Sequence, residues 1–326
     1  MTQTERAVVA GWSGFIGRAI VEELRSRGYE VQRVGRGGPD ASWDDPASLA
    51  RVVDGADLLV NLAGKSVNCR YTNANRDEIL RSRVATTRAL HEAVARAARP
   101  PRLWLNASTA TIYRAALDRP QTESGGELGT GFSVDVARNW EREFFAGELP
   151  RTRRVALRMA IVLGGPASEM LFRVARLGLG GTEYDGPWFP HRRYRGIGPE
   201  PSAAPAPWQR SRGRQRFSWI HLDDVLGAIA FIDAHEELEG AVNLAAPNPV
   251  DNRTLMASLR RTTGRRVGLP AMRWMLEPAM LLLRTEPELV MKSRWVLPER
   301  LSEAGYAFRW PELDAALDDV AARDRG

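Results

Sequence analysis

The sequence predicts an α/β fold, in which a doubly wound parallel sheet with helices on both faces carries a smaller mixed C-terminal cap. Three observations support this prediction. Short apolar runs alternate with segments of helical periodicity through the first 165 residues. A glycine-rich turn joins the first apolar run to the first helical segment. The second half of the chain is less regular, and from residue 252 onward its pattern is mostly helical.

Each element of the first half rests on its own pattern of residues. Residues 7–10 are a short apolar strand. The helix predicted over 15–27 places its apolar residues on one face and ends at Gly28. A longer helix over 76–98 is followed by two prolines, which cannot continue it. Further strands are predicted over 29–34, 58–62, 103–107 and 155–163, and further helices over 46–53 and 132–145.

The second half predicts a return to the sheet and then the cap. A helix over 169–177 ends at a glycine-rich segment, and residues 197–208, rich in proline and alanine, predict a loop. Strands over 217–221 and 241–245, with a helix over 223–234 between them, return to the sheet. We therefore expect a sheet domain of residues 1–165, completed by about 217–246, and a cap of residues 166–216 and 247–326 that forms the substrate side.

The composition is that of an ordinary globular protein. Hydrophobic residues make up 44% and charged residues 26%, which excludes a disordered chain, a collagen or a disulfide scaffold. Cys69 is the only cysteine, so an intrachain disulfide is excluded. The chain opens without a cationic segment followed by an apolar one, and its most apolar late stretch is too short to span a membrane. We expect a cytoplasmic protein with no membrane partner.

The charge balance gives little evidence for nucleic-acid binding. Lysine and arginine number 46 against 40 acidic residues, a net charge of +6, and only Lys65 and Lys292 are lysines. A bias toward arginine this strong indicates GC-rich coding, so nucleic acid is not an expected partner. The exception is the segment 191–216, which holds seven arginines. Three interpretations stay open for it: a lid that binds a substrate phosphate, a nucleic-acid surface, or a solvated mobile loop.

The glycine-rich turn predicts a dinucleotide site. Gly11 permits a tight turn, Gly14 lets a pyrophosphate approach the backbone, and Gly17 lets the helix pack closely on the sheet. The strand before the turn and the helix after it are the context that this Rossmann motif requires. The predicted contacts in the turn are Gly11, Ser13, Gly14, Phe15, Ile16 and Gly17.

The end of the second strand predicts which dinucleotide binds. An acidic residue there would hold the ribose 2′-hydroxyl of NAD. The chain has Gly35 followed by Arg36 instead, and an arginine can pair with a 2′-phosphate. The sequence therefore favours NADP(H) over NAD(H).

Beyond the glycine turn, Asn61-Leu62-Ala63-Gly64 and 108–113 make the chain similar to the extended short-chain dehydrogenase/reductase (SDR) superfamily. More narrowly, it resembles the atypical epimerase-like branch, often labelled nucleoside-diphosphate-sugar epimerase, whose members end in a C-terminal domain of unknown function. The segments that carry this narrower resemblance are 79–84, 178–181, 217–224, 242–247, 292–298 and 301–306. The resemblance covers nearly the whole chain.

The resemblance implies further cofactor contacts. Leu62, Ala63 and Gly64 should pass under the adenosine and the phosphates. Glu78 and Arg83, on the long helix, should flank the cofactor groove. Val162 should line the nicotinamide side.

The resemblance also directs attention to the catalytic groups. The superfamily uses a Ser/Thr at the end of the fourth strand and a Tyr-x-x-x-Lys dyad on the next helix. Ser108 and Thr109 fit the first position, but Ser133 and Ala137 stand where the dyad should be. Tyr113 is a substitute candidate for the acid/base phenol. The predicted catalytic candidates are therefore Ser108, Thr109 and Tyr113.

Two hypotheses for the function follow. The leading one is an NADP(H)-dependent oxidoreductase or epimerase-like enzyme acting on a small polar, possibly nucleotide-linked, substrate. The alternative is a non-catalytic NADP(H)-binding sensor or interaction protein, because the dyad is absent. No cluster of residues has metal-ligand spacing, so no metal is expected. His221 is interpreted as a turn-fixing or helix-capping residue. The oligomeric state stays open.

Overall fold

The main sheet has seven strands, all parallel, in the order β11-β6-β5-β4-β1-β2-β3. The computed structural model describes residues 4–186, 197–202, 210–276 and 291–324. The strands are β1 (Arg6–Ala10), β2 (Glu30–Gly35), β3 (Ala41–Ser42), β4 (Leu58–Asn61), β5 (Leu103–Thr109), β6 (Arg153–Met159) and β11 (Gly240–Leu244). The strand order reverses between β1 and β4, which is where ligands bind in open sheets of this kind. The predicted doubly wound fold is confirmed.

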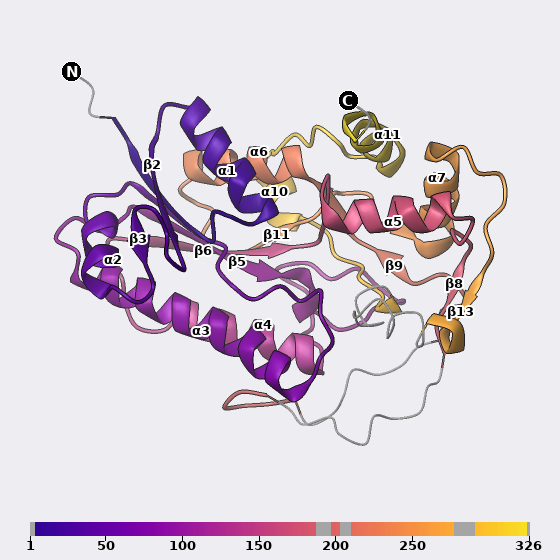
Figure 1. Cartoon of the computed structure of the whole chain (residues 1–326), viewed down its shortest axis with the longest axis horizontal. Coiled ribbons are helices and arrows are strands. Elements are labelled where there is room, and N and C mark those ends of the chain that lie inside the picture. Colours follow the sequence, from indigo (N-terminus) through magenta and orange to yellow (C-terminus); the bar gives the residue numbers. More distant parts are fainter. Residues whose placement is uncertain (1–3, 187–196, 203–209, 277–290, 325–326) are drawn as a thin grey trace.

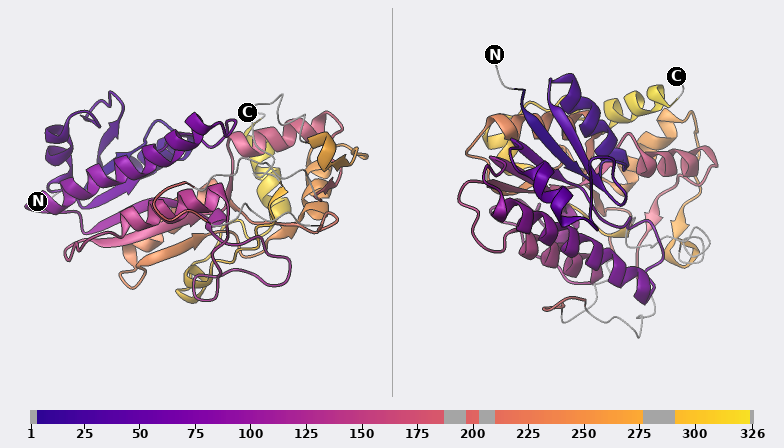
Figure 2. Two further views of the ribbon diagram at one scale, coloured as in Figure 1. Left: turned by 90° about the horizontal axis from the view of Figure 1, so that it is seen from below. Right: turned by 60° about the vertical axis from the view of Figure 1, so that its left-hand side comes forward.

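Helices cover both faces of the sheet (Figures 1 and 2). On one face lie α1 (Phe15–Ser26) and α6 (Leu222–Ala234), and on the other lie α2 (Pro46–Val53), α3 (Asn73–Arg96) and α4 (Phe132–Phe144). Neighbouring residues of β1 point to opposite faces. Val9 packs in the core with Ile20 of α1, whereas Val8 packs with Leu90 of α3, and all four side chains are buried.

The cap has a core of its own, built from α5 (Pro166–Arg176), α7 (Asn252–Thr262) and α11 (Leu313–Arg323). Short strand pairs surround it: β7 (Ile161–Leu163) with β10 (Trp219–His221), β8 (Glu183–Tyr184) with β13 (Ala271–Met272), and β9 (Arg216–Phe217) with β12 (Val250–Asp251). A one-turn 3-10 helix (Ala110–Ile112) follows β5, and α10 (Glu299–Glu303) lies near the C-terminus. The exact domain boundaries stay a prediction.

Two predicted strands are each broken into two. The strand expected over 155–163 stops at Ala160, whose N–H donates to the Leu244 carbonyl at 2.9 Å. Beyond that residue the chain leaves the main sheet, and β7 pairs with β10. The strand expected over 217–221 is likewise interrupted at Ser218, whose hydroxyl donates to the Arg294 carbonyl. Apolar periodicity alone does not reveal such a change of partner.

Within the described residues, no helix is both long enough and apolar enough to cross a membrane.

Candidate functional site

A cleft of about 500 Å³ opens where the strand order reverses. The ends of β1, β4, β5 and β6 form its floor, and the start of α1 forms one wall. The predicted site residues that line it are Gly11, Gly14, Phe15, Ile16, Gly17, Leu62, Arg83, Ser108, Thr109 and Val162. Ser133, at the position of the missing tyrosine, lines it as well. The structure thus brings most of the predicted cofactor residues to one place.

The glycine-rich turn is shaped by close approaches of the backbone. Gly11 has a φ of +78°, and a Cβ there would lie 2.7 Å from the Leu62 carbonyl carbon. A Cβ on Gly17 would lie 2.4 Å from the Gly11 carbonyl oxygen, so the turn and helix α1 touch directly. Gly14 differs from both, because its φ is −72° and the nearest atom to its added Cβ is 3.5 Å away. Nothing in the free protein requires glycine at that position.

Helix α1 presents an uncapped N-terminus to the cleft. Gly14 is its N-cap and supplies no side-chain hydrogen bond to the first turn, which also contains no acidic residue. Unpaired N–H groups and the helix dipole attract an anion at such a position. The turn therefore fits a pyrophosphate both in shape and in charge.

At the end of β2, the side chain of Arg36 is available to bind an anionic group of a ligand. Arg36 is exposed and makes no side-chain hydrogen bond or ion pair among the described residues. Its neighbour Arg33 is occupied, since its Nε lies 3.1 Å from Asp40 and its guanidinium lies over the Trp12 ring. A Cβ on Gly35 would lie 3.4 Å from the Trp12 indole nitrogen, so this wall is tight. The carboxylate of Asp40 is thus paired with Arg33.

Three other predicted cofactor residues, Ser13, Ala63 and Glu78, differ in their burial and in their contacts. Ser13 is exposed, and its carbonyl accepts from Arg18. Ala63 is buried, with its N–H donating to the Asn61 side chain. Glu78 lies outside the lining of the cleft and pairs with Arg81 on the exposed surface of α3.

The Arg83 side chain packs against the backbone of Gly64. A Cβ on Gly64 would lie 3.1 Å from the Arg83 side chain, and the guanidinium stacks over the Trp140 ring at 5.0 Å. Its Nη1 donates to the Lys65 and Ile79 carbonyls. Burial lowers the pKa of Arg83 to about 10, which still leaves it protonated at neutral pH. Glu78 and Arg83 therefore do not act as a pair, and Arg83 alone contributes a fixed cation to the cleft.

The two hydroxyls at the end of β5 are bonded differently. Ser108 donates its proton to Glu141 at 2.6 Å, so that proton is engaged below the cleft. The Thr109 oxygen accepts from the Thr111 N–H at 3.1 Å, and no acceptor holds its own proton among the described residues. Thr109 can therefore donate a hydrogen bond into the cleft. Ala137 is fully buried and offers no polar group in place of a lysine.

Tyr113 does not fit the role of an acid/base that was expected for it. Its side chain is 2% exposed and lies outside the lining of the cleft. The hydroxyl donates to Asn243 at 3.0 Å and accepts from Arg158 at 2.9 Å. Burial raises the pKa of Tyr113 above its ordinary value, although Arg158 opposes this. A phenol held in this way is a packing and hydrogen-bonding group of the core.

A buried polar network lies beneath the cleft. Arg158 makes a two-pronged ion pair with Glu141, at 2.9 and 2.7 Å, and connects it to Tyr113. Asn243 continues the network to Glu123, whose pKa is raised by burial. No local sequence pattern indicates this network, because its members lie far apart in the chain.

Asp135 is a further buried polar residue whose role no sequence pattern indicates. It lies fully buried in α4, two positions after the cleft residue Ser133. Its carboxylate accepts from the Ser202 N–H at 2.8 Å and from the Ile197 N–H at 3.3 Å. Residues 197–202 are thereby anchored beside the cleft. The arginine-rich segment is only partly described: 191–196 and 203–209 lie outside the described residues, and all three interpretations of it stay open.

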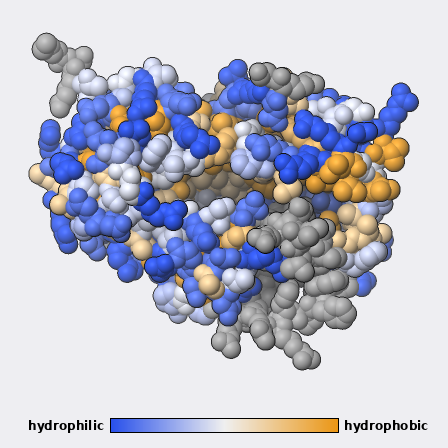
Figure 3. Space-filling model, viewed as in Figure 1, coloured by the Kyte–Doolittle hydropathy of each residue, from blue (hydrophilic) through white to orange (hydrophobic). Residues whose placement is uncertain are grey.

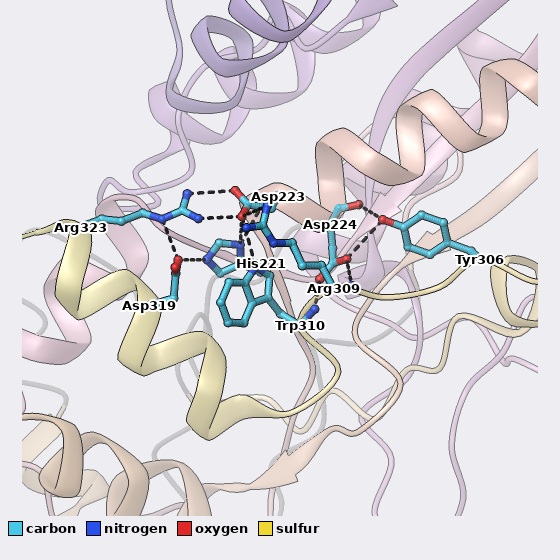
Figure 4. A network of polar contacts seen from close by, with 8 residues as sticks. All are labelled: His221, Asp223, Asp224, Tyr306, Arg309, Trp310, Asp319 and Arg323. Carbon is cyan, nitrogen blue, oxygen red and sulfur yellow. Dashed lines mark hydrogen bonds and ion pairs between the residues drawn. The ribbon is translucent and has the colours of Figure 1, made fainter.

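His221 caps helix α6, as the sequence suggested. Its Nδ1 accepts from the Asp223 N–H at 3.1 Å, and its Nε2 lies 3.1 Å from Asp319 of α11 (Figure 4). Burial lowers the pKa of His221, although the neighbouring carboxylates oppose this. His221, Asp223 and Asp319 have metal-ligand chemistry, but Arg323 lies 2.7 Å from both carboxylates. The guanidinium supplies the positive charge there, so the cluster joins α6 to α11 by ion pairs.

Comparison with known proteins identifies similar families and relatives. Residues 7–130 match the model of the NAD dependent epimerase/dehydratase family, and residues 273–320 match a domain of unknown function, DUF1731. The epimerase family protein SDR39U1 of Bos taurus is 32% identical, over 97% of this chain and 100% of that protein. The epimerase family protein YfhF of Bacillus subtilis is 26% identical, over 96% of this chain and 97% of that protein.

A solved structure supports the same likeness. The crystal structure of human epimerase family protein SDR39U1 (isoform 2), determined with NADPH, has a TM-score of 0.80 and 28% identity. The match covers 97% of this chain and 99% of that one. The Thermotoga maritima UDP-glucose 4-epimerase, at 16% identity and a TM-score of 0.70, shares the fold.

Proposed function

The chain belongs to the SDR39U1-like epimerase family, and from that premise we propose that it is an NADP(H)-dependent oxidoreductase or epimerase-like enzyme acting on a small polar substrate. The observation that carries the proposal is the convergence of the glycine turn, the open α1 N-terminus and Thr109 on one cleft. A nucleotide-linked substrate is the more specific form of this proposal. The crystallised human relative was determined with NADPH, which supports the choice of cofactor.

The residues of the cleft fit such a cofactor. Gly14 leaves space at a backbone position where a Cβ would otherwise stand, and the uncapped α1 N-terminus offers N–H groups to the phosphates. Arg36 would pair with the 2′-phosphate, and Arg83 would add positive charge near Gly64. When bound, the nicotinamide would supply or accept the hydride.

The protein side chains that could take part in the reaction are hydroxyls, which can donate hydrogen bonds but are very poor bases. Thr109 would donate a hydrogen bond to the reacting oxygen of the substrate, which polarises it. Ser133 could orient a substrate group, but it has no basic partner among the described residues, and an alcohol without one is a very poor base at neutral pH. The proton would therefore pass through a water molecule held by Thr109 or Ser108. Tyr113 has no part in this route, because its hydroxyl lies in the buried network.

The choice between NADPH and NADH is tested by Arg36→Ala. A hydrogen bond to a charged group is worth about 1.5–3 kcal/mol, or roughly 10- to 100-fold in affinity. We expect the wild type to bind NADPH more tightly than NADH by such a factor, and Arg36→Ala to lose most of the preference while keeping its NADH affinity. Calorimetric titration measures both. Arg25→Ala, another exposed arginine, is the matched control. Equal affinities of the wild type for the two cofactors would contradict the assignment.

The catalytic assignment is tested by comparing two hydroxyl variants. We expect Ser133→Ala to change any nicotinamide-dependent turnover by less than about tenfold, because serine cannot replace the missing acid/base. Thr109→Ala should lower it by more, since it removes the donor to the reacting oxygen. We also expect no 4-epimerase activity above background on common UDP-hexoses. Robust interconversion of UDP-glucose and UDP-galactose, or a collapse of activity in Ser133→Ala, would place the acid/base on α4 after all.

A second candidate function is a non-catalytic NADP(H)-binding sensor or interaction protein. The observation that favours it is Ala137, a buried alanine at the position where the superfamily's lysine would stand. The two candidates differ in one measurable respect. An enzyme changes the nicotinamide absorbance when its substrate is supplied, whereas a sensor binds NADPH with no turnover of any substrate.

A further inference from the structure

One end of the cap gathers most of the large hydrophobic side chains that are exposed among the described residues. Eleven large hydrophobic side chains are exposed among the described residues, and seven of them belong to two short segments, 177–179 and 267–275. Their exposed fractions reach 69% for Leu177, 75% for Val267 and 65% for Trp274. We call these seven the cap patch: Leu177, Leu179, Val267, Leu269, Met272, Trp274 and Met275. Figure 3 shows apolar surface gathered at this end of the molecule.

The two segments are held together by the backbone. The Leu269 N–H donates to the Gly178 carbonyl at 2.8 Å, and the Gly181 N–H donates to the Leu269 carbonyl at 3.1 Å. Just beyond them, β8 pairs with β13. Glycine is required where the segments cross, because a Cβ on Gly181 would lie 2.3 Å from the Leu269 carbonyl carbon. The patch is therefore built into the fold, and it needs an explanation beyond chance exposure.

The two stretches of chain that carry the patch have charges of one sign only. Residues 170–182 and 252–276 contain eight arginines in all and no aspartate or glutamate. Arg173, Arg176, Arg265 and Arg266 are exposed, and no ion pair of theirs lies within the described residues. The nearby Arg261, in contrast, is paired with Asp314 and Asp318 of α11. This surface has apolar residues at its centre, and at its edge arginines that have no ion-pair partner in the described part of the chain. It would therefore suit a binding partner that has both apolar and negatively charged groups.

We propose that the cap patch docks the protein on an anionic membrane surface. Protruding leucine, valine, methionine and tryptophan side chains would enter the boundary between headgroups and acyl chains, while the arginines would meet the acidic headgroups. Long arginine side chains suit this arrangement, because the stem can lie in apolar surroundings with the charge in water. This is attachment to one face of a bilayer. It differs from the spanning segment whose absence led us to expect no membrane partner.

Other occupants fit the patch less well. A second copy of the chain, meeting the patch through a twofold axis, would bring the same free arginines face to face. Single-stranded nucleic acid binds through several stacked aromatic rings, whereas the patch has one, Trp274, among six aliphatic or thioether side chains. An acidic partner protein remains as the alternative that the experiment must separate from a membrane.

The test is co-sedimentation of the full chain with vesicles of phosphatidylcholine alone or with 30% phosphatidylglycerol, a fraction on the order of that in anionic natural membranes. We expect binding to the anionic vesicles that weakens at high salt, and little binding to the neutral ones. The double variants Leu177→Ser/Leu269→Ser and Arg265→Glu/Arg266→Glu should each lower the partition coefficient by about tenfold or more.

Matched controls keep the test interpretable. Leu117→Ser/Leu128→Ser changes two exposed leucines elsewhere, and Arg25→Glu/Arg27→Glu makes the same charge change at the C-terminal end of α1. Both should bind vesicles as the wild type does, and circular dichroism should show all four variants folded. No binding of the wild type to anionic vesicles would overturn the proposal. So would binding that survives the leucine variant, or patch-dependent binding to polyglutamate but not to vesicles, which would assign the surface to an acidic protein.

Discussion

Replacing Arg158 with alanine is expected to lower the free energy of unfolding by about 3–5 kcal/mol, the range for removing one partner of a buried ion pair. Arg158 and Glu141 are 13% and 11% exposed in their side chains, and two hydrogen bonds join them. Without the arginine, the Glu141 carboxylate would stay buried, and within the described part of the chain the Ser108 hydroxyl would be its one remaining side-chain donor. Tyr113 would lose a partner in the same substitution.

The control for this variant is a second ion pair to the same helix, α4. Arg88 pairs with Glu143 of α4 in a similar two-pronged way, but the Arg88 side chain is 60% exposed. Arg88→Ala should therefore lower the unfolding free energy by at most about 1 kcal/mol. The double variant Glu141→Gln/Arg158→Met, which leaves no buried charge alone, should be more stable than Arg158→Ala. Urea titrations measure all of these, and equal effects of Arg158→Ala and Arg88→Ala would refute the importance of the buried pair.

Replacing Gly14 with alanine is expected to weaken NADPH binding by about 100-fold or more while leaving the free protein nearly as stable as the wild type. The backbone of Gly14 suits alanine, and the nearest atom to the added methyl is 3.5 Å away. The methyl would point into the space that we assign to the pyrophosphate. Gly14→Ala should therefore lower the affinity for NADPH without lowering the stability of the free protein. This result is expected if the glycine is needed for ligand binding and not for folding.

Gly17→Ala provides the contrast. Its added Cβ would lie 2.4 Å from the Gly11 carbonyl oxygen, so the turn itself must shift. We expect this variant to lose thermal stability as well as NADPH affinity. Melting curves with and without NADPH distinguish the two behaviours. If Gly14→Ala bound NADPH as tightly as the wild type, the space beside Gly14 would not be the phosphate site.

The sequence predicted the parts of the fold and site that depend on neighbouring residues. The glycine turn, the helix after it and the strand over 103–107 are local patterns, and the structure has them where expected. The break at Ala160 was missed, because it depends on hydrogen bonds to Leu244 and Ser218 far along the chain. The expectation that Tyr113 serves as an acid/base does not fit the structure for the same reason. Its hydroxyl bonds to Arg158 and Asn243, which are distant in the sequence, and it lies in the core.

Hydrogen–deuterium exchange measured with and without NADPH tests most directly whether NADPH binds in the cleft at the glycine turn. We predict slower exchange in peptides covering residues 11–20, 60–66 and 159–165, which border the cleft, and unchanged exchange in α11. Unchanged exchange over residues 11–20 at saturating NADPH, or protection confined to α11 and the rest of the cap, would contradict binding at the glycine turn.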